Sequence, residues 1–266
     1  EGAPMLKLYI KDFWRYRYLL QNLISRDFKL KYRRSVLGVA WSVLNPLMMC
    51  LVMWAVFSSI FNTRGAGIEN FAVFLLIGQL LFNFFRESTS MAMESVLKNA
   101  PLLRKVYIPK YIFPLEKSCF ALVNCAFSFV ALVLVMLFTG APIHPTILLG
   151  IYPLITLYAF CLGIGLFLSM TYVFFRDIMH IWEVFCTALM YGSAIFYSLD
   201  QISGWLVYVI QLNPVYWYIE SFRACVLYGT GLTLPMVLIC GGCALISLAV
   251  GLGLFKHNQD KFVLYM

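Results

Sequence analysis

The chain has 266 residues, 62% hydrophobic and 12% charged, with a formal net charge of +8 at pH 7. A soluble domain carries roughly 25% charged residues, so this composition excludes a soluble globular protein. The basic residues cluster in a few polar segments rather than on a soluble surface. We therefore expect an all-α integral membrane protein and no nucleic-acid partner.

The N-terminal segment, residues 5–34, is strongly basic and has helical periodicity. We interpret residues 1–4 as a non-native remnant, with Met5 as the native start. Between residues 9 and 30, apolar side chains recur at i, i+3 and i+4, and basic side chains share another face. Basic residues opposite Trp and Phe favour a helix lying in the membrane interface. A solvated helix packed on a partner is the alternative.

Residues 35–266 hold six apolar stretches that we interpret as transmembrane spans of one domain. A bilayer core of ~30 Å needs roughly 20 apolar residues per helix. The predicted spans are residues 36–61, 71–85, 112–138, 147–172, 178–197 and 234–255. Pro46 lies inside the first span, where membrane helices tolerate proline.

The segments between the spans indicate the orientation. Residues 86–110 are polar, and residues 87–99 predict a short separate helix that stops before Pro101. Residues 202–212 and 215–228 are apolar but too short to cross, so they predict re-entrant or interfacial helices before the last span. Nine Lys or Arg residues precede the first span, whereas the opposite loops hold Arg64 and Arg223. Lys and Arg mark cytoplasmic loops, so we expect both termini in the cytoplasm.

Motifs of catalysis and metal binding are missing from the sequence. It contains no G-x-x-x-x-G-K-[ST], H-E-x-x-H or G-x-S-x-G pattern. Cys240 and Cys243 have C-x-x-C spacing, but no second pair or His ligand follows, so we interpret them as packed thiols. We expect no metal, no cofactor and no catalytic site on this chain. An energy source on another polypeptide is the natural inference.

Residues 32–47 read YRRSVLGVAWSVLNPL. This segment resembles the Y-R/K-x-S-x-L-G-x-x-W-x-x-L-x-P pattern that opens type-2 ABC exporter permeases for polysaccharides. Residues 102–109, 175–178 and 213–223 resemble later stretches of the same family, in the same order. The resemblance covers essentially residues 9–266 and is nearest to wall teichoic acid and O-antigen exporter permeases.

The resemblance implies the transmembrane subunit of an ATP-driven exporter of lipid-linked polysaccharide in the bacterial cytoplasmic membrane. Two copies of the permease would form the channel and pair with two copies of a cytoplasmic ABC ATPase. ATP and Mg would bind to that ATPase subunit, so this chain would not be an enzyme itself. The expected substrate is an undecaprenyl-linked polymer, and membrane lipid surrounds the chain.

The family pattern also implies site residues. The loop of residues 87–105 would hold a coupling helix that docks on the ATPase, with Glu94, Lys98, Arg104 and Lys105 as candidates. The N-terminal helix would form a gate beside the substrate's pyrophosphate. Guanidinium groups bind phosphate bidentately, so the gate candidates are Arg15, Arg17, Arg26, Arg33 and Arg34. Anchoring to anionic lipid headgroups is the alternative for all these charges.

Aromatic rings line the translocation path in such exporters, because the apolar C–H face of a sugar rests on a ring. The candidates are Phe57, Phe61, Phe82, Phe85, Tyr191, Phe196, Tyr197, Trp205, Tyr216, Trp217 and Tyr218. Glu220 and Arg223 stand three residues apart and are expected to pair on one helix face. That pair would either brace the re-entrant segment or contact substrate.

Three other functions are compatible with parts of the pattern. The first is a type-2 ABC permease for a drug or small lipid. The second is a membrane-bound enzyme acting on lipid-linked sugars, which would need clustered acidic or His residues that the sequence does not show. The third is a scaffold that recruits a cytoplasmic partner.

Overall fold

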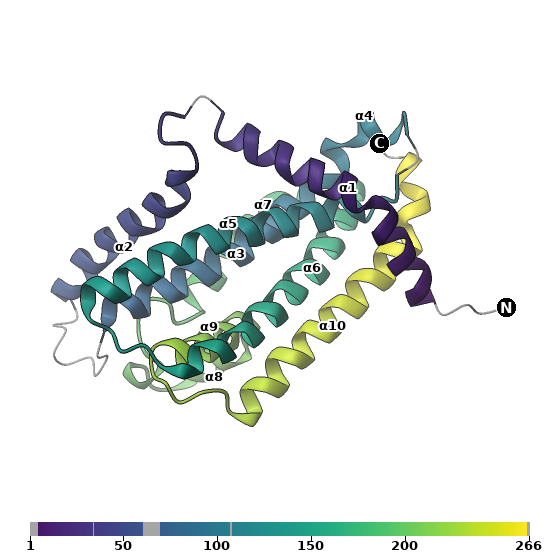
Figure 1. Ribbon diagram of the computed structural model, residues 1–266. Coiled ribbons are helices and arrows are strands. Elements are labelled where there is room, and N and C mark those ends of the chain that lie inside the picture. The colour runs from purple at the N-terminus through teal and green to yellow at the C-terminus, as the bar shows by residue number, and fades with distance from the viewer. Residues whose placement is uncertain (1–4, 34, 61–69, 107, 265–266) are drawn as a thin grey trace.

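The computed structural model describes residues 5–33, 35–60, 70–106 and 108–264, and it describes no side chain of residues 5–15, 58–60, 263 or 264 (Figure 1). Throughout these residues the regular structure is helical, as the composition predicts. The α-helices are α1 Met5–Lys31, α2 Trp41–Ile60, α3 Phe71–Lys98, α4 Ala100–Leu103, α5 Ile112–Thr139, α6 Ile151–Phe174, α7 Ile178–Tyr191, α8 Trp205–Leu212, α9 Pro214–Val226 and α10 Leu234–Asn258. Short 3₁₀ turns occupy Gly38–Ala40, Pro145–Gly150, Leu199–Gln201 and Gln259–Leu264.

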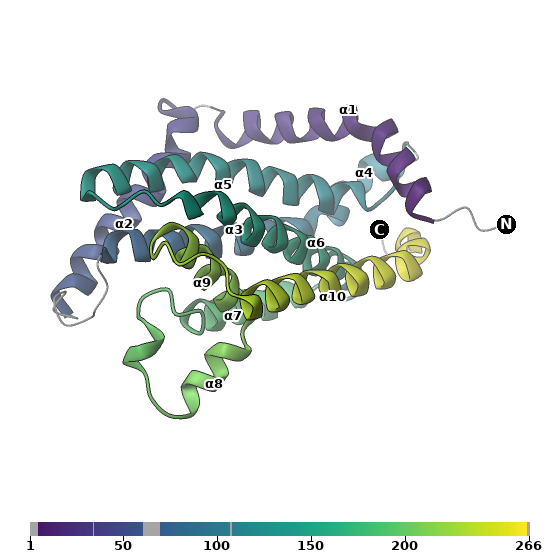
Figure 2. The same ribbon diagram turned by 60° about the horizontal axis from the view of Figure 1, so that its bottom comes forward.

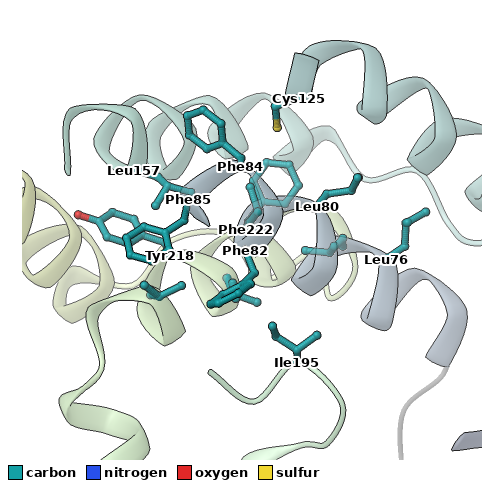
Figure 3. Packing of buried hydrophobic residues seen from close by; sticks show 14 of the residues in the cluster. Leu76, Leu80, Phe82, Phe84, Phe85, Cys125, Leu157, Ile195, Tyr218 and Phe222 are labelled. Atoms are coloured by element: carbon teal, nitrogen blue, oxygen red, sulfur yellow. The ribbon is translucent and has the colours of Figure 1, made fainter. Parts of the chain in front are cut away.

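Helix α3 is the centre of the bundle. In an apolar stretch of 18 residues in the α3 segment, 72% of the residues are buried. In the corresponding stretch of the segment that contains α2, 11% are buried. Most apolar side chains of α3 pack against α5, α6 and α9, and the core is rich in aromatic rings (Figure 3). Phe85, for example, lies 6.1 Å from Phe160 and 6.0 Å from Trp182 between ring centroids. Burial of most of the apolar surface of α3 is expected for a helix at the core of a bundle.

Five helical segments of the described chain are long and apolar enough to cross a membrane. They are Gly38–Phe57, Phe71–Lys98, Ile112–Thr139, Pro145–Phe174 and Leu234–Phe262. Each corresponds to one of the predicted spans. The chain is therefore a multi-pass helical membrane protein.

The remaining predicted span, residues 178–197, is helical over 14 residues in α7. A helix of that length extends about 21 Å, which is less than the ~30 Å bilayer core. After Tyr191 the backbone turns, and Ala194 adopts a left-handed φ of 50°. Side chains of the following segment bond the freed carbonyls: Asn213 donates to the Gly192 oxygen and Arg223 donates to the Ala194 oxygen. These bonds replace those of a longer helix.

The prediction that a span ends at Phe85 and a separate helix follows at residues 87–99 is wrong. Helix α3 runs without a break from Phe71 to Lys98. One face of its second half is buried, including Ser88, Ala92 and Val96. A Cβ atom placed on Gly165 of α6 would lie 2.7 Å from the Ala92 Cβ, so small side chains allow the two helices to approach closely. This packing extends the helix although the segment is polar.

Helix α1 forms as predicted, and its second half runs alongside α5 in the same direction (Figure 2). Contacts advance together along the two helices, from Asp27 with Lys117 to Tyr32 with Asn124. Leu20 and Leu23 of α1 are buried against Ile108 and Phe113. That α1 lies in the membrane interface stays a prediction. The structure shows that α1 is attached to the start of α5.

Candidate functional site

A buried cluster of charges fastens α1 to α5. Asp27 of α1 forms an ion pair with Lys117 of α5, and both side chains are about nine-tenths buried. Lys117 also lies 3.2 Å from a carboxylate oxygen of Glu116, which is fully buried. Arg26 pairs with Asp27 from the exposed side at 3.0 Å. The link therefore shares one ammonium group between two carboxylates.

The charge state of Asp27 follows from these neighbours. Burial alone would raise the pKa of its carboxyl group. The hydrogen bonds and positive charges of Lys117 and Arg26 outweigh burial, so the pKa of Asp27 falls below its ordinary value of 3.8. Asp27 is therefore ionised at neutral pH and holds α1 through a true ion pair.

A second polar link joins the end of α1 to α3. Lys31 forms an ion pair with Glu87 at 2.9 Å, and Asn124 of α5 donates to the other Glu87 oxygen at 2.7 Å. The hydroxyl groups of Tyr32 and Ser42 hydrogen-bond to each other, and the hydroxyl whose proton is not used in that bond donates to the Asn124 side-chain oxygen. This network ties α1, the start of α2, α3 and α5 together.

The network forms one wall of a pocket of about 670 Å³. Other lining residues come from α2, from α3, from α5 and, through Glu183, from α7. The full lining is Lys31, Tyr32, Trp41, Ser42, Asn45, Pro46, Leu80, Asn83, Phe84, Arg86, Glu87, Ser90, Met91, Asn124, Cys125, Ser128 and Glu183. A neighbouring depression of about 370 Å³ shares Lys31, Glu87 and Met91 with it. Both volumes fall within the ~300–1,000 Å³ typical of ligand sites.

Sequence reasoning missed this pocket and the charge cluster beside it. A signal was present, because Glu116 and Lys117 fall inside the predicted span 112–138, where charges are costly and usually paired. Asn83 and Glu87 lay at the predicted boundary of a span, where polar residues are ordinary. Their common orientation becomes visible once α3 is one continuous helix.

The candidate gate residues lie in different surroundings. Arg17 donates to the Tyr18 hydroxyl at 2.9 Å, Arg26 is about half exposed beside Asp27, and Arg33 is exposed in the turn after α1. Arg15 belongs to α1, but its side chain and the whole of Arg34 lie outside the described residues. None of these described guanidinium groups lines the 670 Å³ pocket.

The candidate coupling residues belong to two different elements. Glu94 and Lys98 form an i,i+4 ion pair on the last turns of α3. Arg104 and Lys105 are exposed just after α4. Leu102 and Leu103 of α4 pack against the cluster that buries Leu20 and Leu23 of α1. Residues 87–98 are thus part of α3, and α4 is joined to α1 through this shared apolar cluster.

The C-terminal turn Gln259–Leu264 braces the segment after α4. Lys110 donates to the backbone oxygen of Gln259 and lies 5.6 Å from the centre of the Phe262 ring, which is fully buried. Burial lowers the pKa of Lys110 from its ordinary value, and the charge of Asp260 opposes that shift. The α4 region is thus supported from both ends of the chain.

The candidate path aromatics separate into two groups. Phe82, Phe85, Tyr216 and Tyr218 are buried inside the single chain, so they are removed from the candidates. Phe57 and Phe196 stack at 5.2 Å on the partly open side between α2 and the end of α7, next to Tyr191. Tyr197 and Trp217 donate to the backbone oxygens of Tyr191 and Gln211. Trp205 is 74% exposed on α8, and Phe61 lies outside the described residues.

Arg223 is buried at the meeting point of α9, α3 and the end of α7. Its Nη1 atom lies 3.5 Å from Glu220, so the two residues pair at the predicted spacing. Its terminal nitrogens also donate to the backbone oxygens of Ala194, Ile195 and Phe74. The guanidinium lies 3.4 Å from the centre of the Phe74 ring. These bonds are internal, which favours bracing over substrate contact.

The described residues hold no group of three His, Cys, Asp or Glu side chains placed to share a metal ion. All eight cysteines have free thiols, and Cys240 is fully buried between α9 and α10.

Comparison with known proteins gives the chain a family. A family model described as ABC-2 type transporter matches residues 18–227. The O-antigen export system permease protein RfbA of Klebsiella pneumoniae is 26% identical over 246 residues, which are 92% of this chain and 93% of that protein. RfbA of Myxococcus xanthus is 29% identical over 83% of this chain and 84% of that protein. The capsule polysaccharide export inner-membrane protein CtrC of Neisseria meningitidis is 22% identical over 76% of each chain.

Proposed function

The chain belongs to the ABC-2 type transporter family, and from that premise we propose that it is the permease subunit of an ATP-driven exporter of lipid-linked polysaccharide. The relatives named for O-antigen export match it over nearly their whole length, which supports the substrate class. Wall teichoic acid is the alternative polymer within the same class. The membrane is the bacterial cytoplasmic membrane, with both termini in the cytoplasm, as the distribution of Lys and Arg supports.

The polar pocket between spanning helices carries this proposal. Asn83, Arg86 and Glu183 are exposed on helices of otherwise apolar character. Polar and charged groups at membrane depth are costly against lipid, so they face a bundle interior or a water-filled path. A permease for a hydrophilic polymer needs such a path, whereas a permanently sealed scaffold does not.

A second copy of the chain would complete the path. Helix α2 is apolar but largely uncovered, and the stacked Phe57 and Phe196 lie on its open side beside α7. Exposed apolar side chains continue over α7 at Ile181, Val184 and Phe185. Pairing two chains across α2 and α7 would enclose the pocket mouths between them and exclude lipid from their polar side chains.

We assign the sixth crossing to α7 together with the non-helical residues 192–198. The Gly192, Ala194 and Ile195 oxygens are bonded by Asn213 and Arg223, so this backbone has partners without a helix. Irregular backbone is tolerated at membrane depth when its polar groups are satisfied within the protein. Helices α8 and α9 would then re-enter from the outer side.

Coupling to ATP hydrolysis would proceed through α4 and α1. A cytoplasmic ABC ATPase, binding ATP and Mg, would dock on α4 and on Arg104 and Lys105. Because Leu102 and Leu103 pack on the same cluster as α1, a displacement of α4 is transmitted to α1. Helix α1 acts as the gate, and Arg15, Arg17, Arg26, Arg33 and Arg34 receive the pyrophosphate of the lipid-linked polymer.

Replacement of residues 99–106 by a flexible linker of equal length tests this function. We expect the variant to lose co-purification with the ATPase and to leave its host's glycan on the cytoplasmic side. A matched linker at residues 141–143, between α5 and α6, should preserve both properties. Normal assembly and normal surface glycan in the first variant would contradict the proposal.

A further inference from the structure

The 670 Å³ pocket has two walls of different character. One wall is the network of Lys31, Glu87 and Asn124, whose polar groups bond to each other. The other wall carries Asn45, Asn83, Arg86, Ser90 and Glu183, and none of these side chains has a hydrogen-bond partner among the described residues. Unused donors and acceptors that line a concavity are available to a ligand.

The unpartnered wall is built mainly by one face of α3. Asn83, Arg86 and Ser90 follow one another at three- and four-residue intervals, so they project to the same side of the helix. Asn45 of α2 and Glu183 of α7 also line the pocket. Three rigid helices therefore hold amide, hydroxyl, guanidinium and carboxylate groups around one space.

The charges of the lining cancel. Lys31 and Arg86 contribute two positive charges, and Glu87 and Glu183 contribute two negative charges. A site for pyrophosphate is expected to have an excess of cations, because clefts lined by one sign of charge concentrate the opposite ion. A neutral lining with many donors and acceptors matches an uncharged polyhydroxyl ligand.

An indole ring completes the composition. Trp41 lines the pocket and is 41% exposed, so part of its surface is available. An aromatic face accepts the apolar C–H face of a pyranose ring, while the hydroxyl groups bond to amides and carboxylates. A zwitterionic phospholipid headgroup would match the charges but would leave the uncharged amides and Trp41 without a role.

We propose that this pocket is a subsite for one or two uncharged sugar residues of the lipid-linked glycan. This inference rests on the proposed function and adds the site where the polymer is recognised. Lys31 and Tyr32 form the pocket edge, and Arg33 follows them outside. A pyrophosphate held by the arginines of α1 would therefore place the first sugars in the pocket.

Ligand-observed saturation-transfer NMR on the purified permease–ATPase complex tests binding. The probes are methyl N-acetylglucosaminide and methyl glucoside, observed through their protons, and inorganic pyrophosphate, observed through broadening of its ³¹P line. S90F fills the pocket from α3, and S203F makes the same change at an exposed loop position before α8. We expect transfer to at least one glycoside in the wild type and S203F, and its loss in S90F. Equal transfer in S90F, or broadening of the pyrophosphate ³¹P line with transfer to neither glycoside, would overturn the proposal.

Two milder variants keep the test valid if S90F folds poorly. N83A and E183Q each remove hydrogen-bonding capacity without filling space. Loss of one hydrogen bond to a charged group in E183Q should weaken glycoside binding about tenfold. Unchanged glycoside affinity in both variants would contradict the subsite.

Glycan export by the same complexes separates this inference from the proposed function. Export in the wild type that falls in S90F and E183Q supports both. Export that is equal in all variants contradicts the subsite and leaves the proposed permease function intact. Absence of export even in the wild type contradicts the proposed function itself, whether or not the glycosides bind.

Discussion

Two buried charges, Arg223 and Glu116, are held in opposite ways. Arg223 donates to three backbone carbonyls and pairs with Glu220, and its plane covers the Phe74 ring. Neither carboxylate oxygen of Glu116 accepts a hydrogen bond within the described residues, and its ion partner Lys117 is shared with Asp27. The first site fixes several backbones at once, whereas the second leaves a buried carboxyl group with one shared partner.

The difference separates a densely bonded part of the molecule from one that is held by a single shared cation. Around Arg223, α3, α9 and the end of α7 are joined by bonds that all break together if the guanidinium leaves. At Glu116, the situation differs: if α1 moved away and took Asp27 with it, the Lys117 ammonium group could pair with Glu116 alone. A displacement of α1 would thus be compensated within α5, as the proposed gate requires.

The largest effect is expected from R223A. The substitution removes the donors for three backbone oxygens and leaves Glu220 without its partner, which should cost about 3–5 kcal/mol of the free energy of unfolding. Thermal unfolding followed by intrinsic fluorescence in lipid nanodiscs measures the loss. R176A, at an exposed turn before α7, is the control. Equal stability of the two variants would mean that Arg223 does not brace the bundle.

The next effect is expected from K117M, which leaves Asp27 and Glu116 without their shared cation. Loss of a hydrogen bond to a charged group costs about 1.5–3 kcal/mol. We expect faster amide hydrogen exchange in residues 16–31 of α1 and unchanged exchange in α9. E116Q keeps the pair of Asp27 and Lys117, so α1 should stay protected. Equal loosening in both variants would contradict the assignment of Asp27 as the fastening carboxylate.

A smaller effect is expected from G78A. A Cβ atom at this position would lie 2.9 Å from the Arg223 Nη2 atom and 3.1 Å from the Ile195 Cγ2 atom. Overpacking of this kind costs about 1–3 kcal/mol. G242A, in α10, meets no atom within 4 Å and is the matched control. A G78A protein as stable as G242A would show that Arg223 and Ile195 can shift to accommodate the added methyl group.

The smallest effect concerns pH. The pKa of Asp27 is depressed below 3.8 in the folded protein, so its contribution is fully present above the unfolded pKa of about 3.9. That contribution is lost only as the pH falls through the lower folded pKa. Hydrogen exchange of α1, corrected for its intrinsic pH dependence, should therefore show no loss of protection between about pH 8 and pH 5. Loosening of α1 within that range would indicate a different titrating group.

The sequence predicts much of this fold, because long apolar runs and helical periodicity depend on local composition. Five predicted spans, α1 and the pair of short helices α8 and α9 follow from that information. The position where α3 ends does not follow from local composition. It depends on the packing of Ala92 and Val96, which are buried, and α6 lies directly against Ala92. The end of α7 depends on Arg223 and Asn213, which are distant in sequence.

The candidate site was predicted less well for a related reason. Basic residues and aromatic rings are recognisable by type, and so the sequence favoured the arginines of α1 and many Phe and Tyr residues. The pocket is made from Asn, Ser and Glu residues on four helices, and nothing local in the sequence brings them together. Phe82 and Phe85 show the opposite error, since the same aromatic chemistry also builds a core.

Transport by reconstituted vesicles tests the central claim most directly. The permease and its ATPase are placed in liposomes with the lipid-linked glycan on the ATPase side, and glycan on the opposite side is measured with a lectin. We predict glycan transfer that requires ATP and both subunits and that is lost when residues 99–106 are replaced. ATP-driven transfer of a short-chain lipid or drug without any transfer of the glycan would contradict a polysaccharide export permease.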